Sequence, residues 1–228
     1  MVYWRQLDLP AGIRRLSAIR IVGGQASGRR LVAPKGLSTR PTGERVREAL
    51  FSMLGSEVVS ACVLDLYAGS GALSIEAMSR GADSAVLVEP NFQARQAIKS
   101  NLRALASERS VIVKGTTAER FVEEALAFKQ RFSLVFCDPP WLSGIHPKVL
   151  MALADLTTAQ GLVIIEHPKS AILDAVPGMQ AVRTRHWGDT AVTWYRPGLT
   201  AQALAESTVA NGRAAQPTKQ QLSEEDRR

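Results

Sequence analysis

The residues that decide the fold are ACVLDLYAGSGA, at positions 61–72. The apolar run over 62–67 predicts a strand, and it leads through Gly69 and Gly71 straight into a stretch that favours helix over 72–80. Glycines at such a turn let the backbone approach a ligand closely. In open α/β sheets, ligands bind where the strands end. This stretch therefore predicts the first strand, turn and helix of a doubly wound sheet.

The same alternation of strand and helix continues along the chain. Further apolar runs, nearly continuous as in strands buried on both faces, lie at 85–89, 111–114, 133–137 and 162–166. Helical patterns separate them at 91–105, 119–129 and near 146–157. On the helix over 91–105 we expect one apolar face, formed by Phe92, Ala97, Ile98, Leu102 and Leu105.

The carboxyl-terminal part breaks this alternation. The segments 179–188 and 190–197 meet at Gly188 and Asp189 with no room for a crossover helix, which predicts an antiparallel hairpin. The fold class is thus α/β, with a doubly wound, mostly parallel, seven-stranded, Rossmann-like sheet that ends in this hairpin.

The chain divides into four parts. We expect a flexible extension over 1–18, and a basic hairpin and helix over 19–57, in which 19–34 forms the hairpin and 44–54 the helix. The α/β domain spans 58–197. Residues 198–228 are rich in Ala, Gln and Ser without a sustained apolar face, so they predict a disordered tail.

Charge is the informative part of the composition. The 228 residues include 28 Lys and Arg against 21 Asp and Glu, for a net charge of +7. The first 50 residues hold ten basic residues and three acids, so the whole excess lies there. A basic block on a neutral body indicates an element that binds a polyanion.

Other classes of protein are excluded. No apolar run approaches the roughly 20 residues of a membrane helix, and the first thirty residues do not form a secretory signal. We expect a cytoplasmic protein without contact to membrane. Cys62 and Cys137 give neither a disulfide framework nor a metal site, because their strand positions place them roughly 10 Å apart. The three histidines show no ligand spacing.

A cofactor site is predicted around the glycine turn. Asp65 ends the first strand, the loop Ala68, Gly69, Ser70, Gly71 and Ala72 follows, and Glu89 closes the second strand, where a carboxylate accepts ribose hydroxyls. Ser74 stands where a dinucleotide fingerprint needs a third Gly or an Ala, so the match to that fingerprint is imperfect. Asp65 suits a cationic cofactor such as S-adenosylmethionine. The plainer alternative is that the glycines only make a tight turn.

The tetrapeptide Asp138-Pro139-Pro140-Trp141 follows the fourth strand and predicts the reacting site. Two prolines remove two backbone donors and fix φ, which leaves carbonyls outside the sheet. The Asp138 carboxylate and a neighbouring carbonyl can then both accept from one planar amino group. Trp141 offers a flat face for a purine, worth about 1–3 kcal/mol. The alternative is a proline-rich turn with Trp141 as a core anchor.

These blocks resemble the bacterial 16S ribosomal RNA guanine-N2 methyltransferases. The resemblance covers roughly residues 19–197 and rests on RIVGGQASGRRL (20–31), RPTGERVREALF (40–51), VLDLYAGSGALSIEAMSRGA (63–82) and FCDPPW (136–141). It implies a class I methyltransferase fold that uses S-adenosylmethionine to methylate one guanine of small-subunit RNA. The substrate it implies is a partly assembled subunit rather than naked 16S rRNA, and we expect the enzyme to be a monomer.

The resemblance also implies roles for single residues. Asp65 and the loop 68–72 would face the methionine part of the cofactor and Glu89 its ribose, while Thr117 and Ala118 would border the adenine. Asp138, Pro139, Pro140 and Trp141 would clamp the guanine amino group. The last position is often Tyr or Phe in this family, and Trp141 departs from that while keeping a stacking face.

The basic block supplies the predicted RNA contacts, which are Arg20, Arg29, Arg30, Arg40, Arg45 and Arg47. Arginine binds phosphate through a bidentate fork and stacks on bases, so it suits RNA better than lysine does. A solvated basic surface without a partner is the alternative. The resemblance also implies that Arg40, Thr42, Arg45 and Glu48 partly serve the active site.

Three other functions remain open from the residues alone. The first is methyl transfer to another planar amine, namely adenine N6, cytosine N4 or a glutamine amide; such relatives generally carry Asn where Asp138 stands. The second is an NAD-type oxidoreductase, which would need a complete dinucleotide fingerprint and has no use for residues 138–141. The third is a non-catalytic RNA-binding module, which would bind no cofactor.

Overall fold

The computed structural model describes residues 19–34, 43–103, 105, 110–141, 143–171 and 176–198. The predicted extension over 1–18 lies outside the described residues, as does the predicted tail over 198–228 except for Gly198. Arg40 and Thr42 lie outside them as well. In the part of the chain that is described, no helix has the length and apolar character needed to cross a membrane.

The centre of the molecule is a seven-stranded sheet with the strand order β5-β4-β3-β6-β7-β9-β8. Neighbours from β5 to β7 pair in parallel, and β9 lies between β7 and β8 and is antiparallel to both. The predicted fold class is confirmed, including the carboxyl-terminal hairpin. The strands are β3 (Cys62–Asp65), β4 (Ser84–Val88), β5 (Ser110–Lys114), β6 (Phe132–Cys137), β7 (Thr157–Pro168), β8 (Met179–Trp187) and β9 (Thr190–Pro197).

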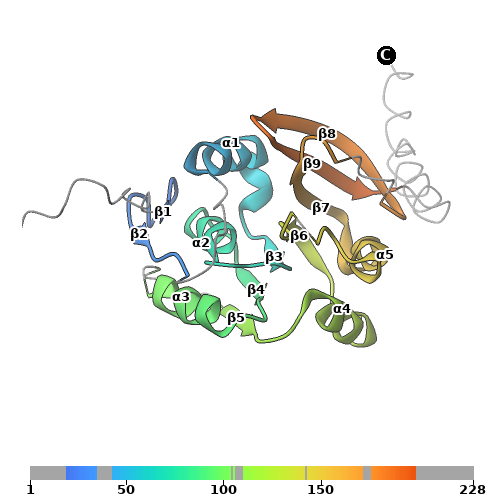
Figure 1. Ribbon diagram of the computed structural model, residues 1–228, viewed down its shortest axis with the longest axis horizontal. Helices are drawn as coiled ribbons and strands as arrows, with labels where there is room; N and C mark the ends of the chain where they lie inside the picture. The colour runs from blue at the N-terminus through green and yellow to red at the C-terminus, as the bar shows by residue number, and fades with distance from the viewer. Residues whose placement is uncertain are drawn as a thin grey trace, which may run out of the picture.

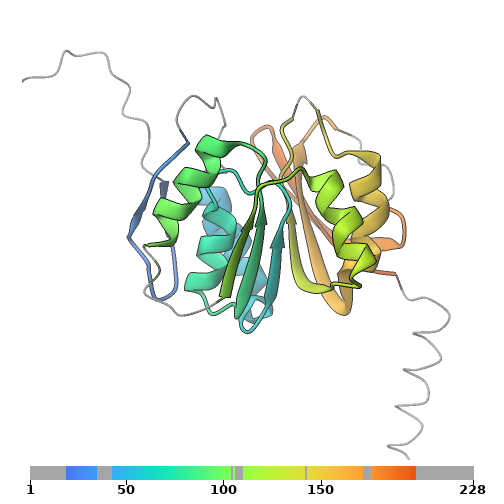
Figure 2. The same cartoon turned by 90° about the horizontal axis from the view of Figure 1, so that it is seen from below.

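Helices cover both faces of the sheet, as the parallel connections require. One face carries α1 (Glu44–Leu54), the short 3₁₀ helix η1 (Gly55–Val58), α2 (Ala72–Ser79) and α3 (Phe92–Leu102). The other face carries α4 (Ala118–Ala127) and α5 (Pro147–Leu156), which lie side by side (Figures 1 and 2). The side chains of Asn91, Thr117 and His146 cap the amino ends of α3, α4 and α5.

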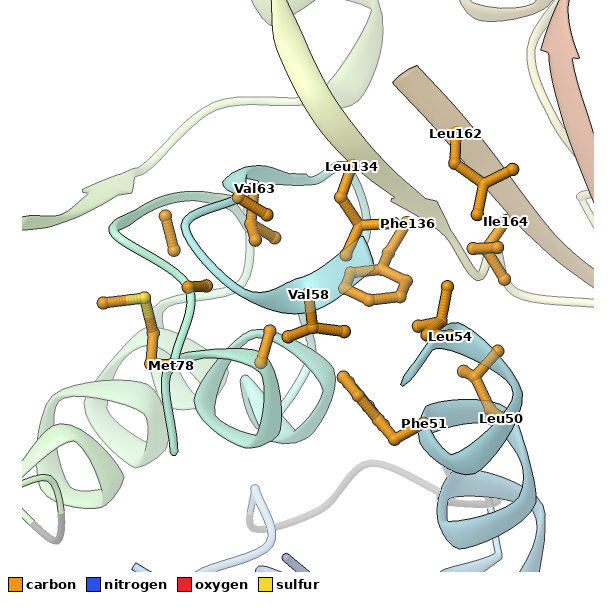
Figure 3. Close-up of a cluster of buried hydrophobic side chains, with 14 of the residues drawn as sticks. Leu50, Phe51, Leu54, Val58, Val63, Met78, Leu134, Phe136, Leu162 and Ile164 are labelled. Atoms are coloured by element: carbon orange, nitrogen blue, oxygen red, sulfur yellow. The ribbon is translucent and has the colours of Figure 1, made fainter. Parts of the chain in front are cut away.

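Alternate residues of the strands feed two separate cores. On β6, Leu134 and Phe136 face α1 and α2, whereas Val135 and Cys137 face α4 and α5. Figure 3 shows the first core, where the rings of Phe51 and Phe136 pack at a centroid distance of 5.8 Å. Apolar residues on both faces of one strand explain why its sequence is a continuous apolar run rather than an alternating one.

The predicted amino-terminal hairpin is present as β1 (Ile19–Arg20) and β2 (Arg30–Leu31), at the side of the molecule formed by α2 and α3 (Figure 1). Its apolar side chains pack against Ile75 of α2. The turn comes so close to the helix that a Cβ on Gly24, which has φ +78°, would lie 2.0 Å from the Ser79 carbonyl oxygen. Only glycine fits at this position.

The structure corrects the prediction for Phe92 and agrees with the prediction for the two cysteines. Phe92, predicted on the apolar face of α3, has 58 % of its surface exposed, because Asn91 caps the helix there and the buried face runs through Ala94, Ala97, Ile98 and Asn101. The Phe92 ring instead lies beside Arg95. Cys62 and Cys137 are both free thiols, one exposed and one buried, as their predicted separation requires.

Candidate active site

The chemically important residues lie at one edge of the sheet, where the parallel strands end. Strand pairing places Asp65 opposite Phe136, and Cys137 opposite Ile165. Residues that directly follow these strands, including Glu89, Thr117 and Asp138, are therefore brought to the same edge although up to 73 positions separate Asp65 from Asp138. The sheet topology, rather than closeness in sequence, assembles this site.

The glycine loop is a tight strand-to-helix turn. Gly69 and Gly71 have φ values of +52° and +77°, which L side chains rarely adopt. The Gly71 N–H donates to the Ala68 carbonyl oxygen at 2.6 Å, and the Ala68 N–H donates to the Val88 carbonyl oxygen at 3.1 Å. A Cβ on Gly71 would also crowd the Leu87 side chain at 3.1 Å. The loop is therefore held against β4 in one shape.

Glu89 fixes this loop from the neighbouring strand. One carboxylate oxygen, Oε2, accepts from the Gly69 N–H at 2.9 Å, and the other, Oε1, accepts from the Asn91 N–H at 2.8 Å. Each carboxylate oxygen has more than one acceptor direction, so both retain capacity for the hydroxyl groups of a ribose. Glu89 thus shapes the loop and can also bind the cofactor predicted there.

Asp65 lies beneath the loop and is fully buried. Burial raises its pKa from 3.8 to about 7, and a hydrogen bond from the Ser74 hydroxyl to Oδ2, at 2.9 Å, opposes this rise. Its other oxygen, Oδ1, is buried without a hydrogen-bond partner among the described residues. A buried, unpaired acceptor is costly unless a ligand completes it. This oxygen is therefore the observation that bears on the predicted role of Asp65 toward the cationic part of S-adenosylmethionine.

Thr117 and Ala118 follow β5 at the same edge of the sheet. Thr117 caps α4, with its hydroxyl oxygen accepting from the Arg120 N–H at 3.5 Å, and Ala118 is buried against the core beneath that helix. The pairing of β4 with β5 brings them to the same edge as Glu89, which follows β4 and holds the glycine loop.

The segment 138–141 leaves the sheet directly after β6. Asp138 is half-buried, Pro139 is buried, and Trp141 has 38 % of its surface exposed. The Pro140 carbonyl oxygen accepts from the Ser143 N–H at 3.1 Å and from the Gly144 N–H at 3.0 Å. That carbonyl is thus engaged in its own turn.

A small depression connects the two halves of the site. It is lined by residues of α1, α2, β6, β7 and β9, namely Leu50, Leu73, Phe136, Cys137, Asp138, Ile164, Glu166 and Val192. We call it the strand-end pocket. Its volume is about 10 Å³, so a planar base could rest at its mouth but not inside it. Leu73 belongs to the first turn after the glycine loop, so the pocket joins that loop to Asp138.

Four of the six predicted RNA-binding arginines are exposed. Arg20, Arg29 and Arg30 belong to the hairpin, and Arg45 lies on α1. Arg20 forms an ion pair with Glu44 at 3.4 Å. A depression of about 260 Å³ opens between the hairpin and α1, lined by Arg20, Ser27, Glu44, Glu48 and the hairpin backbone. The fifth predicted residue, Arg40, lies outside the described residues.

Arg47 departs from the prediction. Only 1 % of its surface is exposed, its Nη2 donates to the Arg20 carbonyl oxygen, and its Nε lies 3.7 Å from Glu76 Oε2. Burial lowers the pKa of Arg47, while the charge of Glu76 opposes that change. The phase of α1 turns this side chain inward, so Arg47 joins the hairpin to α2 and does not belong to the RNA-binding surface.

Sequence reasoning missed the residues that complete this junction. Glu76, fully buried in α2, accepts from the Val22 N–H at 2.7 Å and from Arg80 Nε at 2.7 Å. Asn101 of α3 donates to the Val32 and Ser70 carbonyl oxygens, which links the hairpin to the glycine loop. The signal that could have revealed a buried charge is Glu76 itself, the single charged residue of the helix over 72–79.

Comparison with known proteins agrees with this geometry. Residues 19–196 match the family described as "Conserved hypothetical protein 95". A Bacillus subtilis (strain 168) protein, YlbH, provisionally named an rRNA methyltransferase, is 35% identical over 78% of this chain and 98% of its own length. The Escherichia coli (strain K12) ribosomal RNA small subunit methyltransferase D is 35% identical over 70% of this chain and 79% of its own.

A solved structure is also similar to this chain, at the same sequence identity. The Escherichia coli protein yhhF, provisionally titled a methyltransferase, superposes with a TM-score of 0.69 at 35% identity. The match covers 80% of this chain and 99% of the other. The hairpin, the sheet as far as Arg196 and the site lie within residues 19–196, which match the family.

Proposed function

The chain belongs to the family described as "Conserved hypothetical protein 95", and from this premise we propose that it methylates the exocyclic N2 of a guanine in small-subunit ribosomal RNA, using S-adenosylmethionine. The family relatives in Bacillus subtilis and Escherichia coli support rRNA methyl transfer. The choice of guanine N2 is supported by Asp138 and by the resemblance of residues 136–141 to enzymes of that specificity.

One observation carries the proposal. The strand-end pocket places the Asp138 carboxylate and the first turn after the glycine loop against the same small volume. Methyl transfer to nitrogen needs a donor and an acceptor aligned in a dry site, and positioning supplies most of the rate. A dinucleotide oxidoreductase has no need for this adjacency, and a simple RNA-binding module has no need for the unpaired Asp65 oxygen.

The cofactor residues follow from the loop geometry. Asp65 and the loop 68–72 hold the methionine part, Glu89 holds the ribose, and Thr117 and Ala118 border the adenine. When bound, S-adenosylmethionine supplies an electrophilic methyl group. The chain contributes the fixed loop, the buried carboxylate and the apolar wall of Leu73 that excludes water beside the reacting atoms.

The acceptor residues follow from the turn after β6. The Asp138 carboxylate and the Pro139 carbonyl accept the two N–H bonds of the guanine amino group, which directs the nitrogen lone pair out of that plane. Trp141 stacks on the purine. As the nitrogen gains a bond and becomes positively charged, Asp138 stabilises that charge and can hold the released proton.

The RNA reaches this site through the exposed arginines. Arg20, Arg29, Arg30 and Arg45, together with Arg40, contact the phosphate backbone. Residues 19–57 thus act as the docking element and 58–197 as the catalytic domain. The target guanine must leave its stack before its N2 can enter the site, which costs least in a loop. The enzyme acts in the cytoplasm as a monomer on partly assembled small subunits.

An Asp138→Ala variant tests the acceptor half. We expect turnover on small subunits that lack the modification to fall by a factor of about 10²–10³, because one preorganised partner of the amino group is lost. Cofactor affinity, measured by calorimetry, should stay within about twofold. The matched control is Asp155→Ala, an exposed carboxylate on α5. Turnover near that of the control would contradict the role of Asp138.

A further inference from the structure

Glu166 is a second carboxylate at the reacting site. It follows Ile165 on β7, and the pairing of Ile165 with Cys137 sets Glu166 beside Asp138 on the neighbouring strand. Both side chains are half-buried, and both line the strand-end pocket. Nothing in the proposed methyl transfer so far uses Glu166.

The direction of Glu166 is set by the alternation of β7. Ile164 belongs to the core beneath α1 and α2, and Glu166 follows it on the same face. His167 faces the opposite way, where its ring nitrogens lie 3.0 Å from the Pro168 carbonyl oxygen and 3.0 Å from the Thr193 hydroxyl. Of these two polar residues at the end of β7, Glu166 is therefore the one on the pocket side.

The pocket is otherwise apolar. Besides the two carboxylates, its lining consists of aliphatic and aromatic side chains and the Cys137 thiol, whose pKa burial raises. The Cys137 thiol is thus a neutral neighbour. Because both carboxylates line the same small volume, a ligand at the mouth of the pocket that carries two adjacent hydrogen-bond donors can donate to both.

Guanine is the base that donates in this pattern. Its Watson–Crick edge carries the N1–H and the N2 amino group next to each other, so two adjacent acceptors match it. Adenine carries a bare N1 acceptor beside its amino group, and cytosine carries a bare N3 acceptor. Either would place a lone pair against a carboxylate, and an unpaired polar contact of this kind is a strong source of discrimination.

We infer that Glu166 selects the base, because its carboxylate accepts from the guanine N1–H while Asp138 accepts from the N2 amino group. This inference rests on the proposed function and names the residue that makes that site specific for guanine. Glu166 does not take part in the transfer of the methyl group. It holds the base by the N1–H donor, which adenine and cytosine lack.

The test compares guanosine with 2-aminopurine riboside at the target position of small subunits reconstituted with RNA that is ligated from segments. 2-Aminopurine keeps the amino group that accepts the methyl but has a bare N1. The wild-type enzyme should prefer guanosine by a factor of about 10–100 in kcat/KM, the value of one good base contact. In Glu166→Gln, whose amide can donate to the bare N1, this preference should fall to near unity or reverse.

Two further variants complete the design. Glu166→Asp keeps the negative charge and should retain the preference even where its kcat/KM is lower. Glu123→Gln, an exposed carboxylate of α4, is the matched control. Because the readout is a ratio measured on one enzyme preparation, a smaller folded fraction does not change it.

The outcomes separate the two claims. Equal losses on both substrates in Glu166→Gln, with the preference unchanged, would overturn the role of Glu166 and leave the proposed function standing. Absence of any wild-type transfer to guanosine would instead refute the proposed function itself. A collapsed preference in Glu166→Gln, with the preference kept in Glu166→Asp, is the expected result.

Discussion

Buried charge is handled differently in two regions of the molecule. At the hairpin junction, formed by Arg47, Glu76, Ser79 and the hairpin backbone, Glu76 and Ser79 are hydrogen-bonded within the chain, and Arg47 Nε, which has no hydrogen-bond partner among the described residues, faces the opposite charge of Glu76 at 3.7 Å. At the strand ends, Asp65 keeps one oxygen and Tyr67 its hydroxyl buried without a hydrogen-bond partner among the described residues. A buried charge that faces an opposite charge within the chain holds structure, whereas a buried carboxylate oxygen with neither a hydrogen bond nor an ion pair is where a ligand is expected.

The contrast also assigns the two kinds of carboxylate. Glu76 is engaged on both carboxylate oxygens, by the Val22 N–H, Arg80 and Arg47, so it holds the hairpin junction together. Asp65 has one buried oxygen without a hydrogen-bond partner among the described residues. Removal of Glu76 should therefore lower the free energy of unfolding, whereas removal of Asp65 should change how that free energy depends on pH.

The largest effect is expected at Glu76. Glu76→Ala leaves Arg47 buried without its partner, and loss of one member of a buried ion pair costs about 3–5 kcal/mol. We expect the free energy of unfolding in urea to fall by that amount. The matched control is Glu124→Ala, which breaks an exposed pair with Lys114 and should cost less than about 1 kcal/mol. Equal losses in the two variants would refute a structural role for Glu76.

A pH-dependent effect is expected at Asp65. Its folded-state pKa of about 7 lies above the ordinary value of 3.8, so the proton stabilises the cofactor-free fold. That contribution is complete below about pH 4 and is lost as the pH rises through 7. Because Asn cannot ionise, Asp65→Asn should gain stability relative to the wild type as the pH rises from 4 to 8, by up to about 4 kcal/mol.

Urea unfolding of both proteins across this pH range measures the difference. Asp83→Asn, an exposed carboxylate, is the control and should follow the wild type at each pH. A constant difference between Asp65→Asn and the wild type would show that Asp65 does not carry this proton. The same variant should bind S-adenosylmethionine more weakly, because the carboxylate that we propose for its cationic part is gone.

The smallest effect is expected on the hairpin surface. Each arginine that contacts a phosphate adds about one to the slope of log affinity for RNA against log salt, so Arg29→Ala and Arg30→Ala should each lower it by about one. Lys129→Ala serves as the control, since Lys129 follows α4, across the molecule from the hairpin (Figure 1). An unchanged slope in the hairpin variants would remove them from the RNA contacts.

Local pattern was enough to predict the sheet and to place the predicted site residues at one edge of it. Two buried strands lead directly into predicted site residues, one into the loop at Gly69 and the other into the turn Asp138-Pro139-Pro140. A parallel sheet brings such strand ends together whatever their spacing in sequence. Burial of single charges could not be predicted in this way. Whether Arg47 faces solvent depends on the rotation of α1 against α2 and on a hairpin that packs over both, which is a property of the tertiary structure.

The position of Glu166 also depends on tertiary structure and could not be predicted from local pattern. Its place at the end of an apolar run was visible in the sequence, but which face of β7 it occupies depends on strand register. That register sets it beside Asp138 and sends His167 to the opposite face. A one-residue shift would exchange the two.

The most direct measurement is the identity of the methylated atom. Small subunits that lack the modification are incubated with the wild-type enzyme and S-adenosylmethionine carrying a labelled methyl group, and the label is then mapped by nuclease digestion and mass spectrometry. The account predicts N2-methylguanine at a single position of the small-subunit RNA. Label on adenine, on cytosine or on protein, with none on guanine N2, would contradict it.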